Sequence, residues 1–598
     1  MNHSVYPPAP APAPAPRRRA VRIAVALTAG ALLTLAAGCS SSGTHAASVP
    51  GADLAKVARA KVRDGGTLRW AVDSVPRTLN AYQSDADADT ATVAGATLPQ
   101  MFTLDAHGTP HADADFVSRA EVTATEPRQV VTYTLRPQAR WSDGRAIGAD
   151  DFAGQWKALN GRNSAYWTAS TAGYDRISAV AAGPKAHQVE VTFATPYADW
   201  RSLFSPLYPK AVTSSPDAFN DGARTKLPAA AGPFAVRAVD TKAGTVTLGR
   251  NPSWWGDRAK LDAIVLTAVP RAQRAARLAA RTVDIAEIDP GALAAVRREP
   301  GVAVRKAPDA AYAQLAINGT AGALTDERVR HAVARAIDRK AIARAVLKPL
   351  GLPVQPLGNH LVLPSQEGYA DHSSALGKLD VQQAQALLAD AGWQRSAAKT
   401  GEKAAGPGDT SAAGALTVVE PARAVAKNGK PLTLRMVLPS DSPTLDDVGG
   451  RIARMLSGIG VRTEISKVKD ESYFQDHIAS GDFDLALYSW PGTAFPATDD
   501  TPIFAKPVPA PDGSLTVAQN YSRVGTDQID QLLTRAGAEL DASTARDLTD
   551  EADSRIWAAA GSIPLYQRPE VVGLRTAVAN AGAFGFQTPS YADLGFRK

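Results

Sequence analysis

The sequence contains one cysteine among 598 residues, and this scarcity excludes two ways of holding a fold together. A lone thiol cannot close an internal disulfide, and it cannot build a cysteine zinc site. Basic residues cluster only near the start, where residues 17–22 hold four arginines; without residues 1–38 the net charge of +6 would fall by four. The rest of the chain has no basic footprint for nucleic acid, so we predict no nucleic acid partner.

Catalytic and metal-binding motifs are missing as well. None of the nine histidines is followed by glutamate, and there is neither a Gly-x-Ser-x-Gly elbow nor a phosphate-binding loop. His107 and His111 are four residues apart, but Gly108 and Pro110 between them forbid a helix, so we interpret the pair as an exposed turn. We predict no catalytic residue, no metal site and no cofactor; a surface-anchored hydrolase with two converging carboxylates is the alternative of another class.

Cys39 follows a basic stretch, a 15-residue apolar run (23–37) and a glycine. Fifteen apolar residues are too few to span a bilayer comfortably, but they suit the apolar segment of a secretory signal. The segment resembles a bacterial lipoprotein signal, which implies that residues 1–38 are removed and that lipid attaches to Cys39. Residues 39–64 would then form a flexible tether to the outer face of the plasma membrane. The alternative is a secreted protein that is cut elsewhere and keeps a free thiol.

Short strands with alternating apolar residues dominate the first half of the chain. Three apolar residues alternate with polar ones in "VVTYTLRP" (130–137), and three more in "QVEVTFATP" (188–196). Between these strands, residues 142–144 predict a tight turn, and a helix is expected to start at the acidic pair 150–151. Antiparallel hairpins are therefore expected in this half.

The second half changes to a helical period. Residues 325–347 carry apolar residues at helical spacing, and Asp338 is placed to restart a helix. Further along, the pattern predicts strand 432–438, helix 444–456, strand 461–468, helix 471–480 and strand 483–489. The first three of these form a βαβ unit with parallel strands. The low-complexity stretch 396–414 is predicted to be a solvated insertion.

The last predicted strand leads into Trp490, Pro491 and Gly492, which combine an aromatic face, a rigid bend and an uncovered backbone. In open α/β sheets, ligands bind beyond the carboxyl ends of the strands. This stretch is therefore a candidate ligand site. The alternative is a loop whose tryptophan fills a gap in the core.

Six stretches in order, from about Gly65 to the C-terminus, resemble the extracellular solute-binding proteins of ABC importers, in the oligopeptide, dipeptide and nickel-binding family (family 5). They include "GGTLRWAVDSVPRTLNAY", "YTLRPQARWSDGRAIGADDFAGQWKAL" and "SGDFDLALYSWPGT". The resemblance implies an α/β, two-lobed, periplasmic-binding-protein-like fold (type II, cluster C) with an extra subdomain inserted in lobe one. The implied bounds are 65–102, 212–304 and 563–598 for lobe one, 103–211 for the inserted subdomain and 305–562 for lobe two.

The function that this resemblance implies is capture without chemistry. A solute enters the cleft, the lobes close, and the closed form is presented to a membrane permease with its ATPase. Peptides, and oligopeptides in particular, are the expected ligands, held as an added strand. The protein is expected to be a monomer that a lipid anchors to the membrane. The alternatives are a nickel chelate, an oligosaccharide, a lipid-like or signalling compound, or a receptor role.

The pocket strand contains the chief departure from the family. Many peptide-binding members have tryptophan, two residues and then an aspartate that pairs with the ligand's free amine; here Trp490 is followed at that spacing by Thr493. Threonine cannot supply the charge. Either Asp499 or Asp500 therefore reaches into the site, or the ligand presents no free α-amine.

Further candidates come from segments that line the cleft in relatives: Asn80, Tyr166, Trp167, Ala231, Gly232, Asn318 and Tyr521. For Tyr166 and Trp167 the alternative is packing in the core of the inserted subdomain. Trp141 lies in the most diagnostic stretch, and we predict a structural role in which it pins the turn to the helix that follows.

Overall fold

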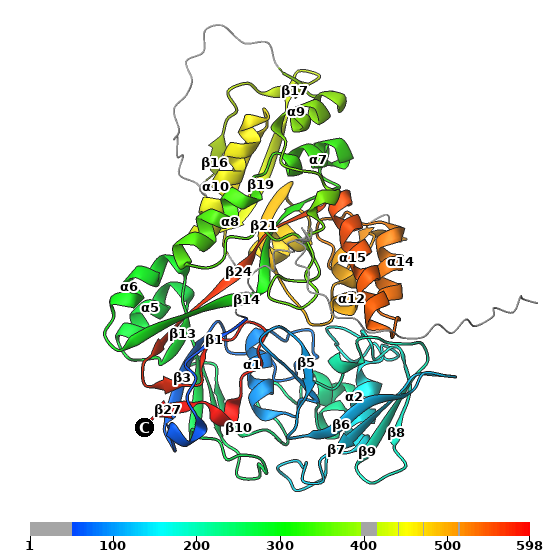
Figure 1. Ribbon diagram of the computed structural model, residues 1–598, viewed down its shortest axis with the longest axis vertical. Coiled ribbons are helices and arrows are strands. Elements are labelled where there is room, and N and C mark those ends of the chain that lie inside the picture. Colours follow the sequence, from blue (N-terminus) through cyan, green and yellow to red (C-terminus); the bar gives the residue numbers. More distant parts are fainter. Residues whose placement is uncertain (1–50, 396–415, 441, 470–471, 512–514) are drawn as a thin grey trace, which may run out of the picture. The chain divides into compact units, whose positions relative to one another are not determined.

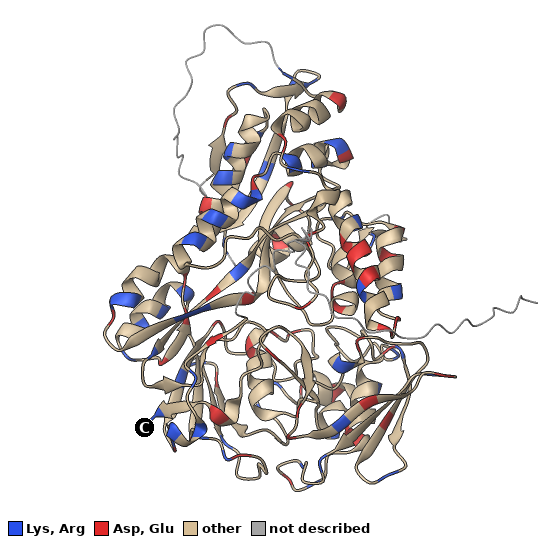
Figure 2. Cartoon of the chain, in the orientation of Figure 1, with Lys and Arg blue, Asp and Glu red and all other residues tan. Residues whose placement is uncertain are grey.

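The computed structural model describes residues 51–395, 416–440, 442–469, 472–511 and 515–598 (Figure 1). The predicted signal, Cys39 and the predicted insertion 396–414 lie outside these ranges. Within them, no helix has the length and apolar character that crossing a membrane requires. Basic and acidic side chains are interspersed along the described chain (Figure 2).

A mixed sheet of eleven strands is the frame of the described chain (Figure 1). In spatial order its strands are β10 (Phe234–Asp240), β11 (Thr245–Arg250), β12 (Ala263–Ala268), β3 (Thr67–Val72), β13 (Ile285–Glu287), β24 (Ser562–Arg575), β14 (Val302–Ile317), β21 (Leu485–Pro491), β19 (Thr433–Pro439), β20 (Arg462–Val468) and β16 (Leu416–Val419). The runs β12-β3-β13 and β21-β19-β20 are parallel. Each run therefore has a carboxyl edge at which a ligand can bind.

Nine longer helices accompany this sheet in the described chain, apart from α2, which is described below. They are α1 (Ala88–Thr97), α5 (Arg271–Ala279), α6 (Leu293–Arg298), α7 (Glu327–Arg335), α8 (Arg339–Leu347), α9 (Val381–Asp390), α10 (Pro443–Gly458), α14 (Asp527–Ala536) and α15 (Ala542–Ala559). The predicted βαβ unit is confirmed, because α10 joins the parallel strands β19 and β20. The restart at Asp338 is confirmed too: its side chain caps α8 by accepting from the backbone of Ala341 at 2.8 Å.

Strands β14 and β24 run through the centre of the large sheet. They pair antiparallel from Val302 opposite Arg575 to Ala316 opposite Ser562, and the register is irregular after Pro308. Pro308 stands opposite Pro569. Neither proline has an N–H to donate, so the ladder of hydrogen bonds is interrupted there.

The hydrophobic cores change at the same point in these two strands. Ala307 and Leu574 belong to one core, whereas Leu315 and Ile563 belong to another. The lobe boundaries that the resemblance implied, 304/305 and 562/563, stay predictions; the change of cores falls several residues later on both strands. Apolar periodicity continues without a break through both halves of each strand, so it does not mark where one core gives way to the next. The other domain bounds stay predictions.

A second, four-stranded antiparallel sheet has the order β6 (Val117–Ala124), β7 (Val130–Leu135), β9 (Gln188–Phe193) and β8 (Ile177–Ala182). The alternating apolar residues of β7 and β9 are buried, as predicted: Val131, Tyr133, Leu135, Val189, Val191 and Phe193. The helix after the Ser-Asp-Gly turn is α2 (Ala149–Leu159), which begins at the predicted acidic pair. The core around this sheet also includes Leu98 and Phe219, so the bounds 103–211 remain a prediction.

The predicted tether is wrong for residues 51–64. β1 (Asp53–Leu54) pairs with β26 (Gly582–Ala583), and β2 (Val62–Arg63) pairs with β27 (Gly595–Arg597). Val62 is fully buried. These residues therefore belong to the folded body, because the last strands of the chain give them partners that local composition does not reveal.

Two elements near the predicted pocket also differ from expectation. The described part of the predicted helix 471–480 is a π-helix over Tyr473–Ala479. The following strand is shifted toward the C-terminus, so Trp490 and Pro491 are its last residues instead of a loop. π-helical turns occur frequently at functional sites.

Candidate functional site

The end of β21 offers a strand edge without a strand partner. β14 pairs with β21 over its whole length, from Leu485 to Pro491, but β19 pairs with it only at Leu485 and Ala486. Among the described residues, the β19 side of 487–491 has no paired strand. An extended chain can hydrogen-bond to such an edge.

A pocket of about 430 Å³ opens at this edge. It brings together six residues that the sequence predicted: Trp490, Pro491, Gly492, Thr493, Asp499 and Asp500. Leu104, Gly585 and Phe586 line it as well. A Cβ added to Gly492 would lie 2.5 Å from Leu363 Cδ1, so a larger residue there would meet the pocket wall.

An aromatic row borders the pocket. The ring of Trp490 stacks on that of Tyr521, with centroids 5.7 Å apart and planes at 8°. Tyr488 meets Trp490 edge-on, and Phe474 of the π-helix meets Tyr521 in the same way. Tyr521 therefore lies beside the pocket strand, where the sequence predicted a ligand contact.

Two carboxyl groups line the pocket, those of Asp499 and Asp500, and a third, that of Asp199, lies close enough to affect the pKa of Asp500. Asp500 is 6% exposed, and no described residue hydrogen-bonds to its side chain or forms an ion pair with it. Burial, together with the charges of Asp499 and Asp199, raises the pKa of Asp500 well above its usual value. Asp499 accepts from the hydroxyl of Thr493, and burial raises its pKa as well. Asp199 accepts from Thr498 at 2.7 Å, and burial raises its pKa to about 6.

Of these three carboxyl groups, that of Asp500 is the one without a hydrogen-bond partner among the described residues. A buried carboxylate without a cationic partner costs free energy, and each group tends to hold its proton until a cation arrives. A ligand that brings a cation relieves that cost. The pocket can therefore favour cationic groups without any chemical reaction.

The other predicted residues lie outside this pocket, with their polar atoms bonded inside the fold. Asn80 donates to Phe219 O at 3.0 Å, and the backbone N–H groups of Ala231 and Gly232 both donate to Thr97 O at 2.9 Å. Asn318 donates to the carbonyls of Gly481 and Phe483, which precede the start of β21, at the end of the strand away from the pocket. Tyr166 packs on Phe219, while Trp167 is 54% exposed. The structure does not bring these residues to the pocket.

The structural prediction for Trp141 is confirmed. Its ring is fully buried, and Nε1 donates to Asp151 of α2 at 3.1 Å. Asp151 also accepts from Arg145 at 2.7 Å. The indole thus pins the turn to the helix.

No sequence pattern pointed to the loop over residues 353–372, which packs against residues that line the pocket. Gln366 donates to the carbonyl of Thr493 at 2.8 Å, and Leu363 packs with Phe586. His107, which the sequence interpretation placed in an exposed turn, has its Nδ1 2.8 Å from Ser365 O. No sequence motif marks these residues, and they come into contact only in the folded structure.

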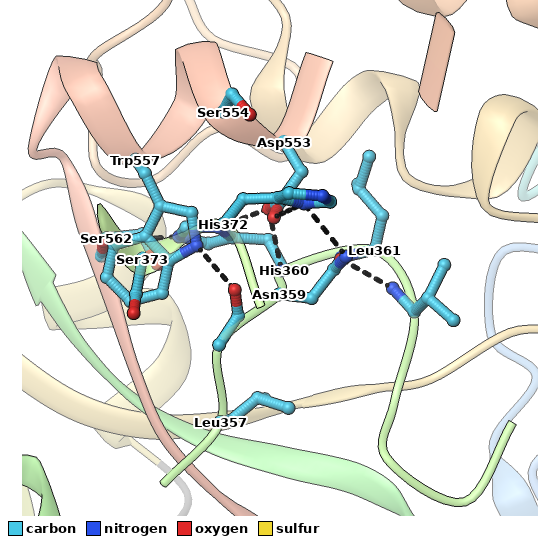
Figure 3. A network of polar contacts seen from close by, with 12 residues as sticks. Leu357, Asn359, His360, Leu361, His372, Ser373, Asp553, Ser554, Trp557 and Ser562 are labelled. Atoms are coloured by element: carbon cyan, nitrogen blue, oxygen red, sulfur yellow. Dashed lines mark hydrogen bonds and ion pairs between the residues drawn. The ribbon is translucent and has the colours of Figure 1, made fainter. Parts of the chain in front are cut away.

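A buried polar network holds this loop against α15 and β24 (Figure 3). Asp553 accepts from the backbone and Nδ1 of His360 at 2.8 and 2.7 Å and from Nδ1 of His372 at 2.9 Å. Burial opposes ionisation of Asp553, but these hydrogen bonds outweigh it and lower its pKa. The hydrogen bond to Asp553 raises the pKa of His372. Trp557 closes the network by donating to Gly358 O at 3.0 Å.

Hydrogen bonds also join the region of the four-stranded sheet to α14 and the segment before it. Arg176 and the backbone of Ala198 donate to the carbonyl of Gly537 at 2.9 and 3.0 Å. Asp199, which directly follows Ala198, accepts a further hydrogen bond from the hydroxyl of Thr498. These contacts join the region of the four-stranded sheet to the end of α14 and to the segment that contains Thr498.

The comparisons with known proteins agree with this architecture. Residues 119–510 match the profile of the bacterial extracellular solute-binding proteins, family 5 Middle. The oligopeptide-binding protein OppA of Mycobacterium bovis is 34% identical over 579 residues, which cover 94% of this chain and 91% of OppA. Among solved structures, the periplasmic EDTA-binding protein EppA is similar with a TM-score of 0.79 and 25% identity, over 92% of this chain and 99% of EppA.

The oligopeptide-binding protein AppA from Bacillus subtilis, solved in complex with a nonapeptide, has a TM-score of 0.69 and 16% identity, over 90% of this chain and all of AppA. That likeness supports the fold. By its profile match and its kinship to OppA over nearly its whole length, this chain belongs to the bacterial extracellular solute-binding proteins of family 5.

Proposed function

We propose that this protein captures peptides, oligopeptides in particular, and delivers them unchanged to the permease of an ABC importer. The observation that carries the proposal is the buried, unpaired carboxyl of Asp500 beside the free edge of β21. A peptide has both features that such a site rewards, a main chain that can pair with a strand and a cationic amine. The relative named as oligopeptide-binding, at 34% identity, supports the same ligand class.

The ligand main chain would add to β21 beyond Ala486, and Trp490 and Tyr521 would pack on its side chains. Its amine would lie at Asp500, with Asp499 as the second carboxyl. A hydrogen bond between charged groups contributes about 1.5–3 kcal/mol, or roughly a tenfold to hundredfold change in affinity. Asp500 thus takes over the charge that Thr493 cannot supply.

Release and delivery would depend on movement between the two parts of the chain whose separate hydrophobic cores are connected by β14 and β24. Strands β14 and β24 would act as the hinge at the paired prolines Pro308 and Pro569, and ligand contacts to both sides would favour closure. A lipid on Cys39 would keep a monomeric protein at the outer face of the plasma membrane, close to the permease and its ATPase. No cofactor, metal or catalytic residue takes part.

A competition within one peptide mixture tests the proposal. A chymotryptic digest of casein is split, one half is N-acetylated with a heavy label, and the halves are mixed and incubated with the dialysed protein. Mass spectrometry of the retained peptides should show the free amine favoured at least about tenfold. In peptides without lysine, the preference measures recognition of the α-amine alone. In peptides with lysine, it also includes recognition of the side-chain amine.

Two variants test whether Asp500 causes the preference for the free amine. Asp500→Asn should abolish the preference for the free amine, and Asp547→Asn, on the exposed face of α15, should leave it intact. Retention of no peptide at all by the native protein would refute peptide capture. A strong amine preference that survives both Asp499→Asn and Asp500→Asn would refute the roles of these residues.

A further inference from the structure

The short segment 584–586 connects the region of the proposed hinge to the pocket. Gly585 and Phe586 line the pocket, and Phe586 belongs to a small hydrophobic core that also contains Trp490 at its border. Phe584, only two residues earlier, belongs to a different core, the one that contains Ala307 of β14. Three consecutive residues thus pass from the core at the hinge to the wall of the pocket.

Glu570 of β24 fastens this segment to a hinge strand. Its Oε2 accepts from the backbone N–H of Gly585 at 2.8 Å. In the sheet, Glu570 stands opposite Ala307, directly next to the two paired prolines at which the register of β14 and β24 becomes irregular. The carboxyl therefore joins the point where the strands are expected to bend to a residue that lines the pocket.

Backbone packing holds the same segment against the other hinge strand. Gly585 has a φ of +55°, and a Cβ on it would lie 2.8 Å from the carbonyl oxygen of Pro308 and even closer to that of Gly51. Only glycine leaves room for so close an approach at this φ. Because the contact is tight, a movement of β14 at Pro308 has to displace the pocket wall as well.

The charged groups that act on Glu570 are acidic. Burial raises the pKa of this half-buried carboxyl to about 8, and the charges of Asp309 on β14 and Glu287 on β13 act in the same direction. The nearby cations are paired with those two acids: Arg568 lies 3.4 Å from Asp309 and 3.5 Å from Glu287. Arg271 lies 2.9 Å from Glu287. Among the residues that the structure describes, none forms an ion pair with Glu570.

We propose that Glu570 is a positioning residue for ligand capture, which fastens segment 584–586 to the hinge while it is neutral and opposes closure of the cleft when it is charged. This inference rests on the proposed function, and it adds regulation of the same site by pH. Closure removes water from the cleft, which is costly for a carboxylate without a cationic partner. The closed form therefore favours the protonated carboxyl, and by linkage peptide affinity falls as pH rises past the pKa of Glu570.

One peptide from the casein digest serves as the probe. The most abundant retained peptide without lysine is synthesised, and its affinity is measured by titration calorimetry at several values between about pH 6.5 and 9.5. Glu570→Gln keeps an acceptor oxygen for Gly585 but cannot ionise. Its affinity should match that of the native protein at the lowest pH and exceed it by about threefold to tenfold at the highest, if closure raises the pKa of Glu570 by a further half to one unit. The amine of the peptide also titrates in this range, but it does so equally for both proteins.

Further variants locate the effect. Asp309→Asn removes a negative neighbour of Glu570 and releases Arg568, so the affinities of this variant with and without Glu570→Gln should diverge at a lower pH than in the native background. In the ligand-free protein, Glu570→Ala should speed hydrogen exchange at the backbone of 584–586 severalfold, and Glu570→Gln should keep it slow. The matched control is Glu551→Gln, exposed on α15, which should behave like the native protein.

The outcomes separate this inference from peptide capture. Identical pH profiles of the native protein and Glu570→Gln would overturn the control of affinity by this carboxyl and leave peptide capture standing. Unchanged hydrogen exchange in Glu570→Ala would overturn the fastening of the segment to the hinge. Retention of no peptide would overturn peptide capture itself, whereas hydrogen exchange would still decide whether Glu570 holds the segment.

Discussion

Replacing Asp553 by asparagine should destabilise the loop over residues 353–372, which packs against residues of the pocket. The carboxylate is completely buried and accepts three hydrogen bonds, two from His360 and one from His372 (Figure 3). Asparagine has nearly the same shape, but it keeps one acceptor oxygen and places an amide N–H₂ against one of the histidines. Hydrogen bonds to a charged acceptor contribute about 1.5–3 kcal/mol each, and breaking a buried pair costs about 3–5 kcal/mol.

We therefore expect Asp553→Asn to lower the free energy of unfolding by about 3 kcal/mol, and Asp553→Ala to lower it further. Asp550→Asn is the matched control on the same helix. Its carboxyl lies 3.9 Å from His372, and an ion pair this long and partly exposed contributes less than about 1 kcal/mol. Urea unfolding followed by tryptophan fluorescence would measure all three variants.

The pH dependence of the unfolding free energy tests more sharply whether this network is charged. The raised pKa of His372 contributes stability that is fully present below the unfolded-state pKa and is lost as pH rises through the folded-state pKa. The lowered pKa of Asp553 contributes stability that is lost as pH falls through its folded-state pKa. The difference between native protein and Asp553→Asn should thus be greatest between about pH 4 and 6.5, and it should shrink above that range.

A difference in unfolding free energy below about 1 kcal/mol at pH 6 would contradict this reasoning, as would a difference that does not change between pH 6 and 9. Either result would mean that the network is not a charged one. It would then hold the loop no better than neutral hydrogen bonds do.

Three further predictions follow from single contacts. Trp141→Phe should keep the packing but lose the donor to Asp151, and it should lower the free energy of unfolding by about 1.5–3 kcal/mol in urea titrations. Gly492→Val should push on Leu363 and fill the pocket, so peptide retention should fall at least about tenfold while the unfolding free energy falls by about 1–3 kcal/mol; unchanged retention would mean that ligands bind elsewhere. Thr498→Val removes the hydroxyl that donates to Asp199 and so links the segment that contains Thr498 to the region of the four-stranded sheet; small-angle scattering of the ligand-free protein should show a larger radius of gyration, and an unchanged radius would contradict a role for this bond in holding the two regions together.

Local pattern predicted those elements whose determinants lie close together in the chain. The cap at Asp338, the βαβ unit around α10 and the alternating faces of β7 and β9 each depend on residues a few positions apart. Trp141 could be assigned a structural role because its partner Asp151 is only ten residues away. The pocket strand was found because strand pattern and turn residues coincide at Trp490.

The sequence by itself therefore determined the fold class, the lobed architecture and the strand beside which the pocket opens. Only the tertiary structure decided which carboxyl lacks a partner, because the burial of Asp500 depends on segments far away in the chain. The same holds for the point where β14 and β24 change cores and for the pairing of residues 51–64 with the chain's last strands. Burial and charge compensation are sums over spatial neighbours, and residues distant in sequence become neighbours only when the chain has folded.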